Sequence, residues 1–173
     1  MIFAGDNQND DDALVFATES DAKPQPEPAA GPKKYKLLIV DDEKEIHVMT
    51  RLVLSDYSFQ DATLDFQSAY SAKEGRQLIK AHPDAACVLL DVVMEEKDSG
   101  LKLARYIRDE ADNQKLRIIL RTGQPGKAPE NDIIMNYDIN DYKEKTELTT
   151  QKLFTTVTTA LRSFTHLTDL EEK

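Results

Sequence analysis

Residues 36–164 alternate between short apolar runs and stretches in which apolar side chains recur at helical spacing. The runs have the length of buried strands, and the stretches between them are long enough for helices. Strands that alternate with helices form parallel sheets, because each helix returns the chain to the same end of the sheet. The chain is therefore predicted to be α/β, a doubly wound (βα)5 three-layer sandwich with a parallel five-stranded sheet. The predicted strands cover residues 36–40, 63–70, 85–90, 116–120 and 137–142.

The helices are predicted from caps and from periodicity. Ser71 followed by Glu74 is a capping box that opens a helix, and this helix ends before Pro83. Residues 149–164 form the last helix, with its apolar residues on one side, and residues 129–136 form a short, weakly specified one. The residues expected on the inner face of the first helix are Ile46, Met49, Leu52 and Val53.

Composition divides the chain into three segments. Residues 1–34 are acidic and rich in proline, with seven acids against one lysine in the first 30 positions. This composition predicts a disordered tail or linker, and docking of "ALVFA" (residues 13–17) is the alternative. Residues 35–166 have the length and apolar content of one domain. Residues 167–173 are predicted to begin a helical linker to an output region that is not in this chain.

Charge and cysteine content exclude several classes of function. The formal net charge is −10, and the chain has no stripe of basic residues, so direct binding to nucleic acid or to an anionic membrane is not expected. Cys87 is the only cysteine, which excludes an internal disulfide. No apolar run has the length of a membrane span, and the N-terminus lacks the pattern of a signal peptide. These features predict a cytoplasmic location.

Acidic and polar residues gather where the predicted strands end. They are Asp41, Asp42, Glu43, Asp91, Thr122 and Lys145. Ligands of doubly wound sheets bind beyond these ends. Clustered carboxylates are tolerated when a hard cation lies between them, and Mg²⁺ prefers such oxygen ligands. A carboxylate beside a metal ion and a lysine can also attack phosphorus and form an acyl phosphate. Asp91 is the best placed for this, because it ends a wholly apolar strand.

Four separated motifs resemble one known family. "LLIVDDE", "CVLLDVVM", "IILRTG" and "NDYKEKTEL" resemble the receiver domain of two-component response regulators in order and spacing, over residues 35 to 166. The resemblance implies the flavodoxin-like receiver fold. The segment "RTGQPGKAPE" and the residues from "YDINDYKEK" onward also resemble the receiver subgroup found ahead of HD-type, cyclic-dinucleotide phosphodiesterase outputs.

The resemblance implies a phosphorylation and metal site. Asp91 would accept a phosphoryl group on its carboxylate. Asp42 and Asp91 would bind Mg²⁺ directly, Asp41 would hold it through water, and Val93 would supply its backbone carbonyl. The chain would then be no enzyme beyond its own phosphorylation and dephosphorylation.

The resemblance also implies a switch and its partners. Thr122 would hydrogen-bond the phosphoryl group, Lys145 would pair with it, and Tyr142 would be the switch aromatic. The phosphoryl donor would be a sensor histidine kinase or a phosphotransfer protein, and the signal would pass to a C-terminal output domain. A homodimer through the last strand and helix is a further expectation.

The chain departs from the family pattern at two places. Glu95 replaces the usual proline after the phosphorylated aspartate, and Ser99 is an extra residue before the glycine. The loop is therefore expected to run differently near Val93. Thr146 replaces the proline that usually follows the lysine, so a cis peptide bond is not required there.

Several alternatives stay open at the sequence level. Lys143 competes with Lys145 for the inward position, and Glu43 is equally suited to a metal site and to a helix cap. Gln124 is a candidate for orienting a water during dephosphorylation. A Mg²⁺-dependent phosphohydrolase of the haloacid dehalogenase kind also uses an aspartyl phosphate, although Val93 stands where that family has a second aspartate. The third hypothesis is an interaction module that is never phosphorylated.

Overall fold

The computed structural model describes residue 31 and residues 33–123, 131–147 and 149–172. The predicted tail over residues 1–30 and the water-orienting role of Gln124 therefore lie outside the described residues. Of the predicted helix over residues 129–136, the part from residue 131 onward is described and is helical.

Five parallel strands form one sheet in the order β2-β1-β3-β4-β5. This is the doubly wound, flavodoxin-like arrangement that the sequence predicts, with its change of direction between β1 and β3. The central strands β1, β3 and β4 are almost wholly buried, as their apolar runs require. The strands are β1 (Lys34–Val40), β2 (Thr63–Ala69), β3 (Cys87–Asp91), β4 (Arg117–Thr122) and β5 (Ile139–Glu144).

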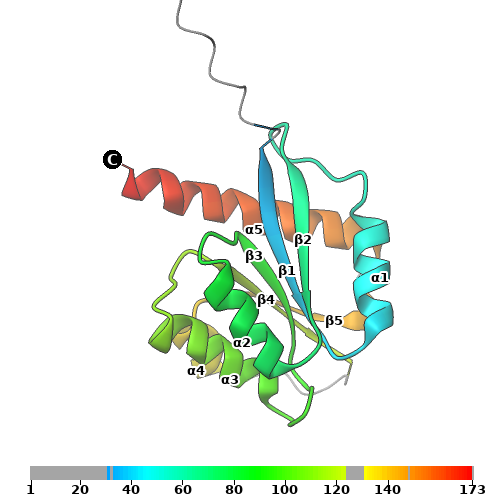
Figure 1. Cartoon of the computed structure of the whole chain (residues 1–173), viewed down its shortest axis with the longest axis vertical. Coiled ribbons are helices and arrows are strands. Elements are labelled where there is room, and N and C mark those ends of the chain that lie inside the picture. The colour runs from blue at the N-terminus through cyan, green and yellow to red at the C-terminus, as the bar shows by residue number, and fades with distance from the viewer. Residues whose placement is uncertain (1–30, 32, 124–130, 148, 173) are drawn as a thin grey trace, which may run out of the picture. The chain divides into compact units, whose positions relative to one another are not determined.

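Helices cover both faces of the sheet (Figure 1). Alternate strand residues supply two separate cores, one that includes side chains of α2 and α3 and one that includes side chains of α5 and the end of α1. The predicted three-layer sandwich is confirmed. The helices are α1 (Lys44–Val53), α2 (Ala72–Ala81), α3 (Ser99–Arg105), α4 (Asn131–Asn136) and α5 (Thr150–Glu171).

The predicted inner face of α1 is wrong in part. Met49 and Leu52 are 45% and 72% exposed, whereas Ile46 is buried together with the polar residues His47 and Thr50. Burial of polar side chains is tolerated only where they find hydrogen-bond partners. His47 shares hydrogen bonds with the Asp41 carbonyl and Ser68. Thr50 donates to the carbonyl of Ile46 within α1 and accepts from Arg121 on β4. The apolar pattern of this helix alone therefore predicts the wrong buried face.

The boundaries of the later elements shift by a few residues. β5 begins at Ile139, two residues after its predicted start, because Asp138 has a positive φ of 47° and turns the chain. α3 continues directly into one π-helical turn, Tyr106–Glu110. α5 continues without a break to Glu171, seven residues beyond its predicted end. No helix among the described residues is both long and apolar enough to cross a membrane.

Candidate functional site

Three aspartates meet at the carboxyl ends of β1 and β3. Val40 lies opposite Leu90 in this pair of strands, so the residues that follow, Asp41 and Asp91, leave the sheet side by side. Together with Asp42 they bring one carboxylate oxygen each to within 4.8 Å of one another. Asp41 and Asp91 are buried and Asp42 is exposed, so the cluster opens to solvent on one side. We call these three residues the acidic cluster.

Lys145 reaches into the acidic cluster from the end of β5. Its Nζ lies 3.0 Å from Oδ2 of Asp41 and 3.2 Å from Oδ2 of Asp91. The exposed side chain of Glu43 also contacts this nitrogen, with its Oε1 at 3.4 Å. The lysine side chain is only 9% exposed, which strengthens these interactions relative to a surface ion pair. The ammonium group offsets part of the repulsion between the carboxylates.

The electrostatics of the cluster shift the protonation of two groups. Burial and the charge of Asp41 raise the pKa of Asp91 to about 7, while Lys145 acts in the opposite direction. Burial alone would lower the pKa of Lys145, but the hydrogen bond and charge of Asp41, together with the charge of Asp91, raise it overall. Lys145 is therefore charged at neutral pH, and an ionised Asp91 depends on nearby cations.

The other predicted site residues take different positions around the cluster. Thr122 is buried at the carboxyl end of β4, one strand from Asp91. Tyr142 is half-buried on β5 and packs against the core that includes α2 and α3. The amide of Val93 donates to Oδ1 of Asp91 at 3.4 Å, which holds the loop after β3 against that carboxylate. The roles of Thr122, Tyr142 and the Val93 carbonyl stay predictions.

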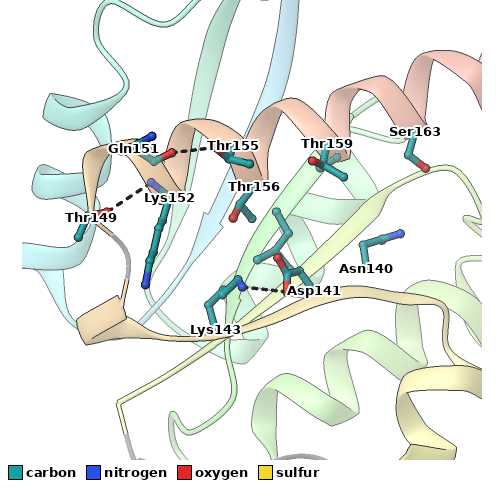
Figure 2. A pocket seen from close by; sticks show the side chains of 12 residues that line it. Asn140, Asp141, Lys143, Thr149, Gln151, Lys152, Thr155, Thr156, Thr159 and Ser163 are labelled. Atoms are coloured by element: carbon teal, nitrogen blue, oxygen red, sulfur yellow. Dashed lines mark hydrogen bonds and ion pairs between the residues drawn. The ribbon is translucent and has the colours of Figure 1, made fainter.

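The two lysines have different partners. Lys143 pairs with Asp141 at 3.7 Å, on the side of β5 that faces α5 (Figure 2). Both side chains line a groove of about 580 Å³ between β5 and α5, whose other wall includes Thr155 and Thr159. This is the face that the sequence analysis assigns to a homodimer, and that assignment stays a prediction. Of the two lysines, Lys145 is the one that contacts the acidic cluster.

Glu43 lies at the start of α1 beside the acidic cluster, and its role in a metal site stays a prediction. It occupies the N-cap position of α1, but its side chain makes no capping hydrogen bond. The amide of Glu43 instead donates to Oδ1 of Asp41 at 2.9 Å. Glu43 thus fixes one aspartate with its backbone and contacts Lys145 with its carboxylate.

Two buried residues behind the cluster escape the sequence analysis. His47, considered there a surface or packing residue, shares hydrogen bonds with the Asp41 carbonyl at 2.8 Å and with Ser68 Oγ at 2.9 Å. Burial lowers its pKa. Arg121, which the sequence analysis uses only to end a strand, lies directly opposite Asp91 in the β3–β4 pair. Because these two residues pair directly, their side chains lie on the same face of the sheet, and the strand pattern of the sequence alone does not give this pairing.

Comparison with known proteins decides the family. The profile of the response regulator receiver domain matches residues 37–158. The chain belongs to the receiver domain family. This receiver is 47% identical over 137 residues to the 3'3'-cGAMP-specific phosphodiesterase 2 of Vibrio cholerae serotype O1 (strain ATCC 39315 / El Tor Inaba N16961). The match covers 79% of this chain and 26% of that protein, so the chain spans about a quarter of the length of its relative.

Solved structures share the same fold. The N-terminal domain of a response regulator/sensory box/GGDEF 3-domain protein from Carboxydothermus hydrogenoformans gives a TM-score of 0.62 at 22% identity, and 77% of this chain and 98% of that one are covered. The signal receiver domain of an HD domain-containing protein from Pseudomonas fluorescens Pf-5 gives 0.60 at 22% identity, with 78% and 99% covered. At these identities the likeness describes the fold of the receiver.

The donor set of this receiver fits a hard divalent cation. The cluster offers only carboxylate oxygens, which are the ligands that Mg²⁺ prefers, and one side of it is open to water. The ammonium group of Lys145 already lies among these oxygens. The acidic cluster is therefore a candidate metal site.

The altered loop of this receiver is tied to α2 by Glu95. The carboxylate of Glu95 accepts a hydrogen bond of 3.1 Å from the amide of Ala72, the first residue of α2. One half of the predicted capping box is present, since Ser71 Oγ accepts from the amide of Glu74 at 3.1 Å, while the Glu74 carboxylate accepts from the amide of Tyr70 instead of Ser71. Two side chains thus satisfy amides at this helix N-terminus. The residue that replaces the family's proline connects the loop after Asp91 to a helix.

Replacing Glu95 with alanine is expected to lower the free energy of unfolding by about 1 kcal/mol, the usual cost of losing a helix cap. Glu95→Gln retains an acceptor oxygen and loses only the interaction of the charge with the helix dipole, so it should cost less than half as much. Urea denaturation of both variants measures the difference. Equal losses in the two variants would mean that the hydrogen bond to Ala72 contributes nothing.

Proposed function

We propose that this receiver accepts a phosphoryl group on Asp91 from a histidine of a sensor kinase or a phosphotransfer protein, with Mg²⁺ as cofactor. The observation that supports the proposal most is the convergence of three carboxylates and Lys145 at the point where the strand order changes direction. Among these carboxylates, Asp91 combines burial with a raised pKa of about 7. Acidic residues with strongly shifted pKa values are concentrated at functional sites.

The proposed reaction is a displacement at phosphorus. An oxygen of the ionised Asp91 carboxylate forms a bond to phosphorus while the bond between phosphorus and the donor imidazole breaks. The imidazole leaves with the electron pair of that bond and takes up a proton from water. Bound Mg²⁺ would offset the charge of the acids and of the phosphoryl oxygens. Asp41 and Asp42 would hold it with Asp91 and the carbonyl of Val93, and Lys145 would pair with the phosphoryl group.

The proposed output is a conformational switch. Phosphorylation replaces the single negative charge of the ionised Asp91 carboxylate with about −1.5 to −2 charges. Lys145 and the Thr122 hydroxyl then bind the phosphoryl oxygens, and the end of β4 moves towards Asp91. Tyr142 follows and changes the face formed by α4, β5 and α5. The receiver itself catalyses only its own phosphorylation and dephosphorylation.

The partner of that face is proposed to be an output domain joined after α5. The V. cholerae relative is a 3'3'-cGAMP-specific phosphodiesterase, so a cyclic-dinucleotide phosphodiesterase is the proposed output. Residues 167–171 continue α5, and the helix is exposed from Asp169 onward, as a helical linker requires. Residues 1–34 would be a tail, residues 35–166 the receiver, and the protein would act in the cytoplasm.

Incubation of the chain with acetyl phosphate and Mg²⁺ tests the proposed function. We expect one phosphoryl group per chain, detected as an added mass on the intact protein, and no labelling once EDTA removes the metal. Continuous release of phosphate without a stable label would instead indicate the phosphohydrolase hypothesis. A chain that neither gains mass nor binds the phosphoryl analogue beryllofluoride would be an interaction module, and the proposal would fail.

A further inference from the structure

Arg121 is a buried cation next to the acidic cluster. Its side chain is 2% exposed, and it projects from β4 directly beside Asp91 on β3. Nη1 donates to Thr50 Oγ1 at 3.1 Å. Its Nε and Nη2 have no hydrogen-bond partner within the part of the chain that the structure describes.

A guanidinium in such a position needs a compensating interaction. Burying a charge costs several kcal/mol unless opposite charges lie nearby, and one neutral hydroxyl does not supply that compensation. The charges that attract Arg121 most are those of Asp41 and Asp91. Burial lowers the pKa of Arg121 to about 10 against this attraction, so the guanidinium remains protonated at neutral pH. Its charge is therefore part of the electrostatics of the acidic cluster.

Arg121 changes the net charge of the acidic cluster and therefore its affinity for cations and anions. Three ionised aspartates with Lys145 and Arg121 leave one net negative charge, and a bound divalent cation turns this into one net positive charge. A phosphoryl group of about −2 charges then replaces the single charge of Asp91, which brings the metal-loaded site to about neutral. Without Arg121, the metal-loaded site would be neutral before phosphorylation and would carry a net negative charge after it. The buried guanidinium therefore disfavours the metal and favours the phosphoryl group.

We propose that Arg121 is a positioning residue of this receiver that acts through its charge, weakening the binding of Mg²⁺ and stabilising the phosphoryl group on Asp91. The inference rests on the proposed function, since it concerns the same site. It assigns to Arg121 a role that neither Lys145 nor Thr122 fills, because Arg121 approaches the acids from inside the fold and its charge is fixed there.

The test compares variants of the full chain in two separate titrations. Mg²⁺ affinity is measured by calorimetry, and beryllofluoride affinity is measured at saturating Mg²⁺, both at about pH 8.5 so that Asp91 is ionised. Arg121→Met is expected to bind Mg²⁺ about tenfold more tightly and beryllofluoride about tenfold more weakly. Arg121→Lys keeps the charge and should stay close to the wild type in both. Thr50→Val removes the hydrogen bond alone and should change neither affinity more than about twofold.

The opposite signs separate an electrostatic role from a structural one. Loss of packing at position 121 would weaken both affinities together, and that result, or no change in either, overturns the inference. If Arg121→Met lacks a cooperative thermal transition, Arg121→Gln, which is neutral but polar, replaces it in the same comparison. Failure of the wild-type chain to bind beryllofluoride would instead refute the proposed function. If the wild-type chain binds beryllofluoride but the Arg121 variants change both affinities in the same direction, only the role of Arg121 is refuted.

Discussion

The Asp91→Asn variant is expected to accept no phosphoryl group from acetyl phosphate and, in metal-free buffer at about pH 8, to be more stable than the wild-type chain by about 2 kcal/mol. The first effect follows because an amide lacks the nucleophilic carboxylate oxygen. The second follows because the neutral amide has no ionic charge to desolvate beside Asp41. A substitution that abolishes the proposed function should therefore raise stability, as removal of strained functional groups often does.

The sign of the stability effect follows from the pKa of Asp91. Its value of about 7 in the folded chain exceeds the ordinary value of 3.8, so between these two pH values the folded state binds more protons than the unfolded state. Stability is then highest below the ordinary value and is lost as pH rises to about 7. The two chains should differ little near pH 4 and most above pH 7. Thermal unfolding across this range measures the difference.

Controls separate this effect from general changes at the surface. Asp56→Asn alters an exposed aspartate outside the cluster and should affect neither labelling nor the pH profile. Saturating Mg²⁺ should stabilise the wild type more than Asp91→Asn, because the variant lacks one carboxylate of the cluster. A phosphoryl label on the Asp91→Asn chain, or lower stability of that chain at pH 8, would contradict the assignment of Asp91.

The sheet and the acidic cluster could be predicted from the sequence because both depend on local patterns. Apolar runs of strand length fix the strands, and the end of a parallel strand fixes where its next side chain lies. Asp41 and Asp91 follow such runs directly, so the register of β1 and β3 brings them together. The resemblance implies Lys145 as the lysine of this cluster, and the structure agrees, since Lys145 contacts Asp41 and Asp91 whereas Lys143 pairs with Asp141.

Features that depend on partners from distant elements could not be predicted. The rotation of α1 is set by His47 and Thr50, whose hydrogen bonds involve β1, β2 and β4, and an apolar pattern has no information on such partners. Arg121 looked like a strand terminator because arginine is rarely buried. Its burial makes sense only with the acids of β1 and β3 in place.

The close packing of Gly100 against the backbone of Asp91 leads to the second large prediction. A Cβ at Gly100 would lie 2.1 Å from the carbonyl oxygen of Asp91 and 2.8 Å from its carbonyl carbon and from Cα of Val92. These are backbone atoms, and the amide of Gly100 already donates to the carbonyl of Val92 at 2.9 Å. Neither α3 nor the end of β3 can move without breaking this contact. A side chain at position 100 must therefore displace the segment that holds Asp91.

Gly100→Ala is expected to lower the free energy of unfolding by about 3 kcal/mol, which corresponds to a fall of roughly 10 °C in Tm. Labelling by acetyl phosphate should also slow, because the Asp91 carboxylate moves with its backbone. Gly75→Ala is the matched comparison, since its Cβ would approach only side-chain methyl groups of Leu103 and Val40, at 2.9 Å. These methyl groups can shift, and alanine is a better helix former than glycine by up to about 1 kcal/mol. The free energy of unfolding should therefore fall by about 1 kcal/mol or less. Calorimetry that found equal losses for the two variants would show that the backbone at Asp91 yields as easily as a side chain. The tight contact of α3 would then have no part in holding the aspartate.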